Sequence, residues 1–350
     1  MKRILLSSAA IVAFAGAAAA EGHTGVTFSG DAQLGYNDDA AGDNDGFYSE
    51  LDVTIGFAAE LDNGLTAAAS VDFEDLAGDG SNDGNNYELS LTSDNAGLYY
   101  GDTNFAAQNV WVAAGPMGND DFSEADGEEA LRGEVSFGGV SAQVSYVLAD
   151  ADGVRATDDL DQLSVGVSGD FGNFNVVMAY QEAADGDYAT ANGDFNNDEV
   201  FGISVGTTLG AADVRLAYAE SEGDDSMGIS VSYPAGPVTV DAGYATNSDA
   251  DDDWDLSVTY ADGPISVTAS TDEESDWALE GSYDVGSGLV AYAGIVDAGD
   301  DFYVAADYDL GSGASLLVSF VEDGGDANGD DEVGANDYQI GTTVELSFAF

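Results

Sequence analysis

Residues 337–350 read DYQIGTTVELSFAF, and the alternation in this stretch decides the fold. In steps of two, one face carries Tyr338, Ile340, Thr342, Val344, Leu346, Phe348 and Phe350. The other face carries Asp337, Gln339, Gly341, Thr343, Glu345, Ser347 and Ala349. Because a β-strand has a period of two, the stretch predicts one strand that is apolar on one side over its full length. At about 3.3 Å per residue it would span roughly 46 Å, which fits a tilted membrane-spanning strand; an edge strand of a soluble sandwich is the alternative.

The first twenty residues predict export. They begin Met1-Lys2-Arg3, continue with an apolar run over residues 4–15 and end in Ala18-Ala19-Ala20, which matches an A-x-A cleavage pattern. The sequence therefore predicts a signal peptide at 1–20 and a mature chain at 21–350. The apolar run is short for a transmembrane helix, and no other long apolar stretch follows it.

The charge balance is extreme. The chain has 68 acidic residues against five basic ones, and cleavage of the signal peptide would remove two of the five. The three arginines that remain, Arg132, Arg155 and Arg215, give the mature chain a formal charge of −65. Such a surface disfavours nucleic acid and other anions as partners and favours cations. The chain has no cysteine, and its 46 glycines with only four prolines suit a β protein with many tight turns.

From Gly25 onward, short alternating stretches are joined by two kinds of connection. Nine are short and rich in Gly, Asn, Asp or Pro, and they lie at 62–64, 95–97, 138–139, 172–173, 210–211, 234–237, 262–264, 286–288 and 311–313. The others are longer and acidic, and include 37–46, 77–86, 150–159, 184–197, 247–253 and 322–336. Short turns at one end and long loops at the other are typical of an outer-membrane β-barrel. Nine turns imply twenty strands, or eighteen or sixteen if a hairpin between Ser226 and Val296 is irregular, and the number should be even.

One connection differs from the rest. After Asp102 the alternation stops until Leu131, which leaves residues 103–130 without a predicted strand. Residues 104–114 read NFAAQNVWVAA, which is apolar enough to pack and to include a helical turn. Because so apolar a segment is unfavourable in water, we expect this loop to fold against the inside of the barrel. A flexible surface loop or a subunit contact is the alternative.

Five stretches, spread from one end of the mature chain to the other, carry a family resemblance. They are GVTFSGDAQLGYN at 25–37, SELDVTIGFAAELDNGL at 49–65, YYGDTNFAA at 99–107, ADYDLGSGASLLVSF at 306–320 and VELSFAF at 344–350. In this order they resemble the general porins of Gram-negative bacteria, of the α-proteobacterial Rhodobacter type. The resemblance implies an all-β transmembrane antiparallel barrel of sixteen strands, usually a homotrimer, in the outer membrane of a Gram-negative bacterium.

The resemblance also implies a function. It points to passive diffusion of small hydrophilic solutes and ions through a channel rather than to an enzyme, with outer-membrane lipid and lipopolysaccharide around the barrel. It further implies that the third long loop, 103–130, narrows the pore and that the terminal Phe350 is read by the barrel-assembly machinery. Two features depart from the family: the turn count exceeds sixteen, and three arginines make a thin basic cluster for a constriction.

Charged residues in and beside this loop are the candidate constriction residues. The loop carries Asp120, Asp121, Glu124, Asp126, Glu128 and Glu129. Arg132 and Arg215 alternate with apolar neighbours, so the pleat points both into the lumen, whereas Arg155 lies in a loop. Acids that face arginines would set up a field across the pore; the alternative is that the arginines pair with carboxylates on the wall. Further inward acids predict an acid-lined, cation-selective pore, and they are Asp31, Asp52, Asp255, Asp307 and Glu345.

Other function classes remain open. Asp326, Asn328, Asp330 and Glu332 alternate like the front half of a calcium-binding EF-hand loop, although Asp331 stands where that loop needs glycine. The resemblance to a channel implies no required cofactor. Ca²⁺ bound at these acidic residues would instead indicate a secreted or surface calcium-binding or adhesive β protein, which is the alternative function. A serine hydrolase is disfavoured, because the only histidine, His23, lies beside the predicted cleavage site. No carboxylate pair for an acid protease or glycosidase stands out among 68 acids.

Overall fold

The computed structural model describes residues 24–38, 46–73, 76, 85–124, 129–148, 160–184, 195–324 and 332–350. The predicted signal peptide, Arg155 and three of the four candidate calcium ligands lie outside these residues. Within the described ranges, no helix has the length and hydrophobicity needed to cross a membrane.

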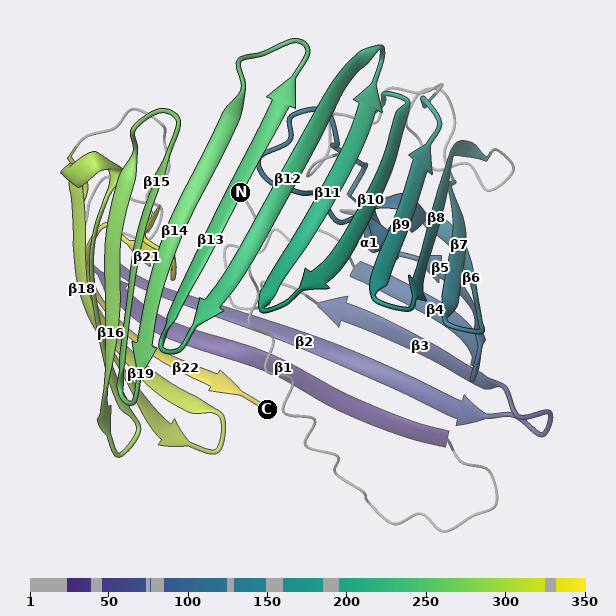
Figure 1. The fold of residues 1–350 in the computed structure, drawn as a ribbon. Helices are drawn as coiled ribbons and strands as arrows, with labels where there is room; N and C mark the ends of the chain where they lie inside the picture. The colour runs from purple at the N-terminus through teal and green to yellow at the C-terminus, as the bar shows by residue number, and fades with distance from the viewer. Residues whose placement is uncertain are drawn as a thin grey trace.

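The chain forms one closed antiparallel barrel (Figure 1). Its wall consists of β1 (Thr24–Asn37), β2 (Gly46–Glu60), β3 (Thr66–Phe73), β4 (Asn85–Ser93), β5 (Ala96–Gly101), β6 (Ala130–Phe137), β7 (Val140–Val147), β8 (Asp161–Phe171), β9 (Phe174–Gln181), β10 (Val200–Leu209), β11 (Ala212–Ser221), β12 (Asp224–Ala235), β13 (Val238–Asn247), β14 (Asp253–Asp262), β15 (Ile265–Asp272), β16 (Trp277–Gly286), β17 (Leu289–Val296), β18 (Asp301–Gly311), β19 (Ala314–Glu322) and β22 (Gly341–Ala349). Each strand from β1 to β19 pairs with the next, β19 pairs with β22, and β22 pairs with β1. The connections hold α1 (Ala106–Val110), the 3₁₀ helix η1 (Asp297–Gly299), β20 (Glu332–Val333) and β21 (Tyr338–Gln339).

The twenty strands of the wall confirm the count made from the turns. All nine predicted short turns join neighbouring strands, and Glu222 and Gly223 alone connect β11 to β12 at the opposite end. The sixteen strands implied by the resemblance are wrong for this chain, because the region from Ser226 to Val296 folds into complete hairpins. Glycines in left-handed conformations keep these turns tight, as Gly288 does between β16 and β17 (φ 86°).

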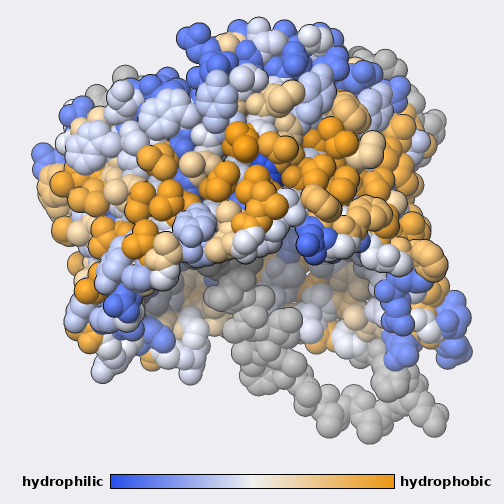
Figure 2. Space-filling model, viewed as in Figure 1, coloured by the Kyte–Doolittle hydropathy of each residue, from blue (hydrophilic) through white to orange (hydrophobic). Residues whose placement is uncertain are grey.

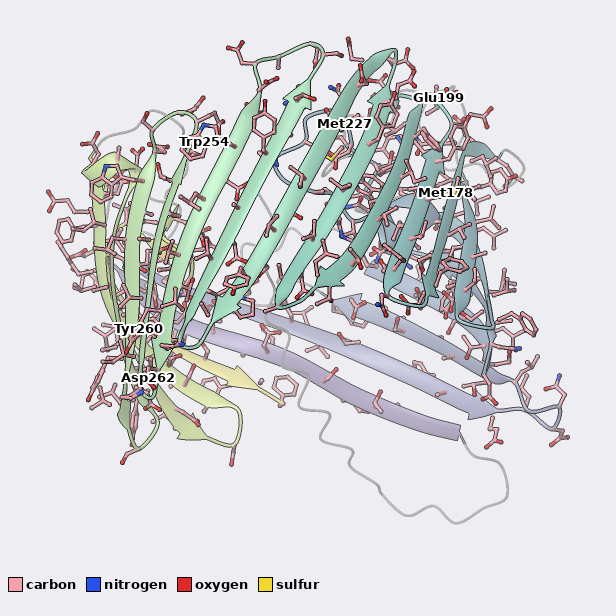
Figure 3. The ribbon with its side chains drawn as sticks, in the orientation of Figure 1. Met178, Glu199, Met227, Trp254, Tyr260 and Asp262 are labelled. Atoms are coloured by element: carbon pink, nitrogen blue, oxygen red, sulfur yellow. The ribbon has the colours of Figure 1, made fainter. Side chains whose placement is uncertain are left out.

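The alternation predicted from the sequence gives the wall an apolar outer face and a polar inner face. Along β14, more exposed and less exposed residues alternate, and Trp254 and Tyr260 point outward, as does Met227 of β12 (Figure 3). Figure 2 shows the outer face as an apolar band that gives way to hydrophilic residues toward the rim. On the inner face, Ser164 and Gln181 are fully buried beneath other parts of the chain. These are the two surfaces of a barrel that has lipid outside and water inside.

The connection between β5 and β6, residues 102–129, folds into the barrel as predicted and is called the lumenal loop below. Its described part contains no strand and one short helix, α1. Phe105 is 1% exposed, and α1 contacts β7, β8 and β9. The loop is one residue shorter than expected at its end, because Ala130 already belongs to β6. Most of its apolar side chains are therefore buried against the wall, whereas Val112 and Ala113 are exposed.

The stretch predicted as one strand, 337–350, is divided in two. Only Gly341–Ala349 forms the wall strand β22, whereas Tyr338 lies in β21 and is 5% exposed. The backbone explains the division, because Asp337 (φ 51°) and Gly341 (φ 91°) take left-handed conformations that interrupt an extended strand. The prediction of a single fourteen-residue strand was wrong for its first four residues.

The barrel closes where β22 meets β1. Phe350 and Gly30 exchange two backbone hydrogen bonds of 2.9 Å each, and the next pair in the register is Ala349 opposite Asp31. A Cβ at residue 30 would lie 2.1 Å from the carbonyl oxygen of Asp52, so this position of the seam requires glycine. The seam is paired from Gly30 to Tyr36 of β1, whereas residues 24–29 pair only with β2 among the described strands.

Deletion of Phe350 is expected to lower the free energy of unfolding by about 1–3 kcal/mol, because it removes two hydrogen bonds worth about 0.5–1.5 kcal/mol each. Phe350→Leu keeps both backbone hydrogen bonds and an apolar side chain, and should stay close to wild type. Urea unfolding of the barrel refolded in detergent micelles measures both variants. A deletion variant as stable as wild type would show that the seam does not depend on this residue pair.

Candidate pore constriction

The lumenal loop lies against inner-face positions that carry no side chain. Four glycines form this seat, namely Gly166 of β8, Gly202 of β10, Gly228 of β12 and Gly243 of β13. A Cβ at Gly228 would lie 1.7 Å from the carbonyl oxygen of Ala114, and one at Gly166 would lie 2.2 Å from that of Ala106. Because real Cβ atoms do not approach other atoms so closely, any other residue at these positions would displace the loop backbone.

Polar side chains of the wall hold the loop backbone in place. Five of them accept hydrogen bonds from loop amides: Ser145 from Ala106 (2.9 Å), Ser164 from Ala107 (2.8 Å), Gln181 from Ser123 (2.8 Å), Asn247 from Gly118 (3.1 Å) and Ser226 from Asn119 (3.1 Å). These bonds satisfy amides that are buried from water and would otherwise cost free energy. The anchored amides reach from the start of α1 to Ser123, so the loop is fixed along its described length.

Two apolar clusters bury the loop's aromatic side chains. The Phe105 ring packs edge-on against the Phe195 ring, with centroids 5.7 Å apart. The rings of Trp111 and Phe122 lie 5.4 Å apart and pack over Val177 of β9. Burial of these rings favours packing of the loop against the inner wall of the barrel.

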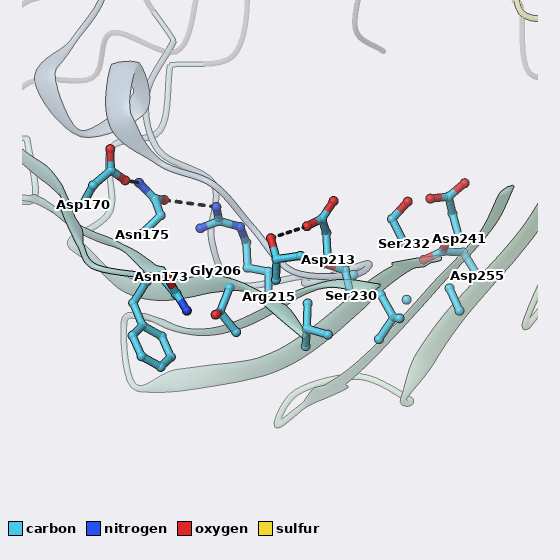
Figure 4. A pocket seen from close by; sticks show the side chains of 18 of the residues that line it. Asp170, Asn173, Asn175, Gly206, Asp213, Arg215, Ser230, Ser232, Asp241 and Asp255 are labelled. Carbon is cyan, nitrogen blue, oxygen red and sulfur yellow. Dashed lines mark hydrogen bonds between the residues drawn. The ribbon is translucent and has the colours of Figure 1, made fainter. Parts of the chain in front are cut away.

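Two cavities meet at Gly115 and Pro116 of the loop. The loop-side cavity, of about 1030 Å³, opens toward the long loops, and its acidic lining includes Asp120, Asp121, Glu124 and Asp198. The turn-side cavity, of about 1160 Å³, reaches the short turn at Gly172, and its charged lining includes Asp170, Asp213, Arg215, Asp241 and Asp255 (Figure 4). The loop therefore lies between the two cavities, with Gly115 and Pro116 lining both.

Three of the predicted loop acids line the loop-side cavity. Asp120 accepts a hydrogen bond from the indole of Trp111 (2.8 Å), and Glu124 accepts one from the side-chain amide of Gln108. Asp121 lines the same cavity. These hydrogen bonds fix two carboxylates at the loop's surface, where they can meet a passing ion.

The remaining loop acids are placed differently. Glu129 accepts hydrogen bonds from the hydroxyls of Tyr87 (2.8 Å) and Tyr100 (3.1 Å). Its position in the pleat before β6 faces the outside of the barrel, so the structure does not bring it to the constriction. Asp126 and Glu128 lie outside the described residues.

Arg132 points to the lumen but is held against the wall. Its guanidinium lies 3.0 Å from the Glu134 carboxylate, donates a hydrogen bond to Thr103 (3.1 Å) and stacks 4.2 Å above the centre of the Tyr99 ring. The side chain is only 8% exposed. This is the wall pairing that the sequence left as an alternative.

Arg215 also points to the lumen and is bound differently. It donates hydrogen bonds to Ser204 (2.9 Å) and Asn175 (3.2 Å), and in the described part of the chain it forms no ion pair. Its guanidinium lies over Gly206, where a Cβ would approach Nη2 to 2.8 Å. Arg215 lines the turn-side cavity, and Asp120, Asp121 and Glu124 line the loop-side one, so among the described residues Arg215 and these three acids lie in different cavities.

Sequence reasoning missed several residues of this site. Asp213 and Asp241 join the predicted Asp255 around Arg215. Both occupy the polar phase of an alternating strand, which is the signal that was available. The same alternation could have placed the four glycines under the lumenal loop on the inner face, since each occupies an inward-facing position of its strand.

Most of the candidate calcium site falls in a part of the chain that the structure does not describe. Asp326, Asn328 and Asp330 lie outside the described residues, and Glu332 begins β20, where it pairs with Gln339. In the ranges given above, no group of three or more acidic or histidine side chains is arranged to hold a metal ion.

Gly228→Val should displace the loop at Ala114 and change the conductance of the pore, because a side chain there cannot coexist with the observed backbone. We expect larger and more variable single-channel steps in planar bilayers than for wild type. Gly133→Val is the matched control, since a Cβ at that strand glycine has no neighbour closer than 3.9 Å. Identical steps for wild type and Gly228→Val would mean that the loop does not limit the current.

Comparison with known proteins identifies relatives of this barrel. A family model described as Gram-negative porin matches residues 7–191 and 167–328. No curated protein is significantly similar in sequence. Similar solved structures include a multiple mutant of the Rhodopseudomonas blastica porin (17% identity, TM-score 0.42), a triple mutant of that porin (18%, 0.43) and a porin refined at 1.8 Å resolution (19%, 0.43). Each comparison covers 93% of this chain and 100% of the other.

The family match covers most of the chain, and the barrel has the features that the sequence resemblance led us to expect, apart from its strand number. The outer face is apolar, the inner face is polar, and the third long connection lies inside. The chain belongs to the Gram-negative porin family and is a β-barrel channel of the outer membrane.

Proposed function

We propose that this porin is a passive, cation-preferring channel for small hydrophilic solutes, with the lumenal loop as its constriction. The observation that supports the proposal is the imbalance of charge along the lumen. Four aspartates share the turn-side cavity with one arginine, and the charged residues around the loop-side cavity are all acidic. Size and charge are sufficient to sort solutes in such a pore, so no bond is made or broken.

Further acids face the lumen beyond these cavities. Asp31 of β1 lies directly opposite Asp52 of β2, and Asp307 and Glu345 occupy inner-face positions of β18 and β22. A carboxylate in water attracts cations over about 10 Å at 0.1 M salt, and this range shortens as salt rises. Carboxylates on several strands therefore favour cations along much of the path.

The first expected outcome is a reversal potential of cation-selective sign when a KCl gradient is imposed across a bilayer that holds the refolded protein. Asp255→Asn should reduce this potential, because Asp255 lines the turn-side cavity. Asp262→Asn is the matched control on the same strand, since Asp262 lies at the rim (Figure 3) and should leave the potential unchanged. An anion-selective wild type, or equal shifts for both variants, would refute cation preference from lumenal acids.

We propose a second role for Arg215, which is to orient dipolar solutes. Its positive charge faces a cavity whose other charged lining residues are all acidic, among them Asp213 and Asp241. Opposite charges around one cross-section create a transverse field that acts on solute dipoles. Arg132 contributes little to such a field, because Glu134 offsets its charge at 3.0 Å.

Arg215→Ala should strengthen cation preference, because it removes an unpaired positive charge from the lumen, whereas Arg215→Lys should preserve it. The matched control removes a neutral pair, with Arg132→Met and Glu134→Gln together, and should leave the preference unchanged. Reversal potentials in one KCl gradient compare the three proteins with wild type. A shift from the paired control as large as that from Arg215→Ala would show that charge in the lumen does not act as proposed.

The resemblance supplies further proposals about assembly. We propose a homotrimer in outer-membrane lipid and lipopolysaccharide, reached after cleavage of residues 1–20. Phe350 ends the last wall strand with its ring 45% exposed, which supports its role as the signal for the barrel-assembly machinery.

A further inference from the structure

A second segment folds into the lumen, at a different part of the wall. It is called the C-terminal hairpin here and comprises residues 332–340, with β20 paired to β21. Phe302 and Val304 of β18 are 37% and 50% exposed on the outer face, so Tyr303 between them points inward. The Tyr338 ring lies 5.0 Å from the Tyr303 ring, centroid to centroid. The hairpin therefore packs on the inner face of the barrel, and Figure 1 shows β21 behind the strands nearest the viewer.

Two glycines enclose the Tyr303 ring. A Cβ at Gly294 of β17 or at Gly334 of the hairpin would lie 2.3 Å from this ring. Tyr303 is only 2% exposed, and Val333 of the hairpin is buried in the same cluster as Val321 of β19. The Tyr303 ring thus lies between the wall at Gly294 and the hairpin at Gly334, so the hairpin is seated on a wall side chain that a glycine accommodates.

A carboxylate of the wall fixes the tip of the hairpin. One oxygen of Glu280 accepts hydrogen bonds from the Tyr303 hydroxyl (2.8 Å) and from the backbone amide of Ala335 (2.9 Å). Leu279 beside it is 46% exposed on the outer face, so Glu280 projects from β16 into the lumen. Beyond this contact, residues 335–337 are exposed.

We propose that the C-terminal hairpin is a second constriction element, with its tip at 335–337 in the path of permeating solutes. The lumenal loop lies on the wall from β7 to β13, and the hairpin lies on β16 to β19. The route for solutes is then bounded by both elements, and the hairpin narrows it on the side of the long loops. This inference rests on the proposed channel function.

The test places a single thiol at the tip. The chain has no cysteine, so Asn336→Cys is the only target of a charged, membrane-impermeant methanethiosulfonate reagent. We expect the reagent to cause stepwise loss of single-channel conductance in planar bilayers. Glu222→Cys, in the exposed two-residue turn between β11 and β12, is the matched control and should be labelled without loss of conductance.

A second variant tests the C-terminal hairpin through the buried side chains that hold it against the wall. Tyr338→Ser with Val333→Ser removes the buried contacts of the hairpin without altering a wall strand, and should raise the conductance. Tyr308→Ser, on the outer face of β18, is its control and should conduct as wild type does.

The outcomes distinguish a failure of the proposed channel function from a failure of the inference about the C-terminal hairpin. A wild-type protein that forms no channels overturns the proposed function and this inference with it. If mass spectrometry verifies that Asn336→Cys is labelled and the conductance of its channels is unchanged, the inference alone is overturned. A thiol at residue 336 that does not react in the folded barrel also overturns it, since the tip would then lie outside the aqueous path.

Discussion

Every backbone amide and carbonyl of the barrel wall needs a partner within the protein, because a membrane supplies none. The pairing of β22 with β1 meets this requirement at the last open edge, through hydrogen bonds as far as Gly30 and Phe350. A closed barrel requires a strand number at which the first and last strands can pair, and in this chain that number is twenty. A barrel of twenty strands encloses more space than its inward-facing side chains fill. A barrel of this width holds water, so we propose that segments which fold inward determine its selectivity.

A segment that folds into a water-filled lumen must bury apolar surface without a core to receive it. Both inward segments of this chain meet that need in the same way. Wall glycines make the room in both cases: Gly228 lies under the backbone of the lumenal loop, and Gly294 lies under the ring of the wall residue Tyr303, on which the hairpin packs. Wall polar groups, such as Ser164 and Glu280, then satisfy the segment's amides. The inner face therefore serves as a packing surface in two places and as a wet surface elsewhere.

Much of this architecture follows from period and turn chemistry alone. Alternation identified the two faces of the wall, and Gly, Asn, Asp and Pro identified nine turns, because both signals are local. The pattern failed at Tyr338, where apolar residues keep the phase of a strand although Asp337 and Gly341 break its backbone. The pairing of Arg132 with Glu134 could have been predicted from the sequence, since residues two apart in a strand share a face. Asn175 as a partner of Arg215 could not, because it lies two strands away and depends on register.

Opposed carboxylates on the inner face are tolerable because the lumen of a porin holds water. Asp31 and Asp52 are directly opposed across β1 and β2, an arrangement that disfavours a strand pair. In bulk water, two unit charges 4 Å apart interact with about 1 kcal/mol, whereas in a dry interior the same pair would be far costlier. Mobile cations reduce the repulsion further, so an ion that occupies the pore also stabilises its wall. Under the proposed cation preference, permeation and stability are therefore linked through the same carboxylates.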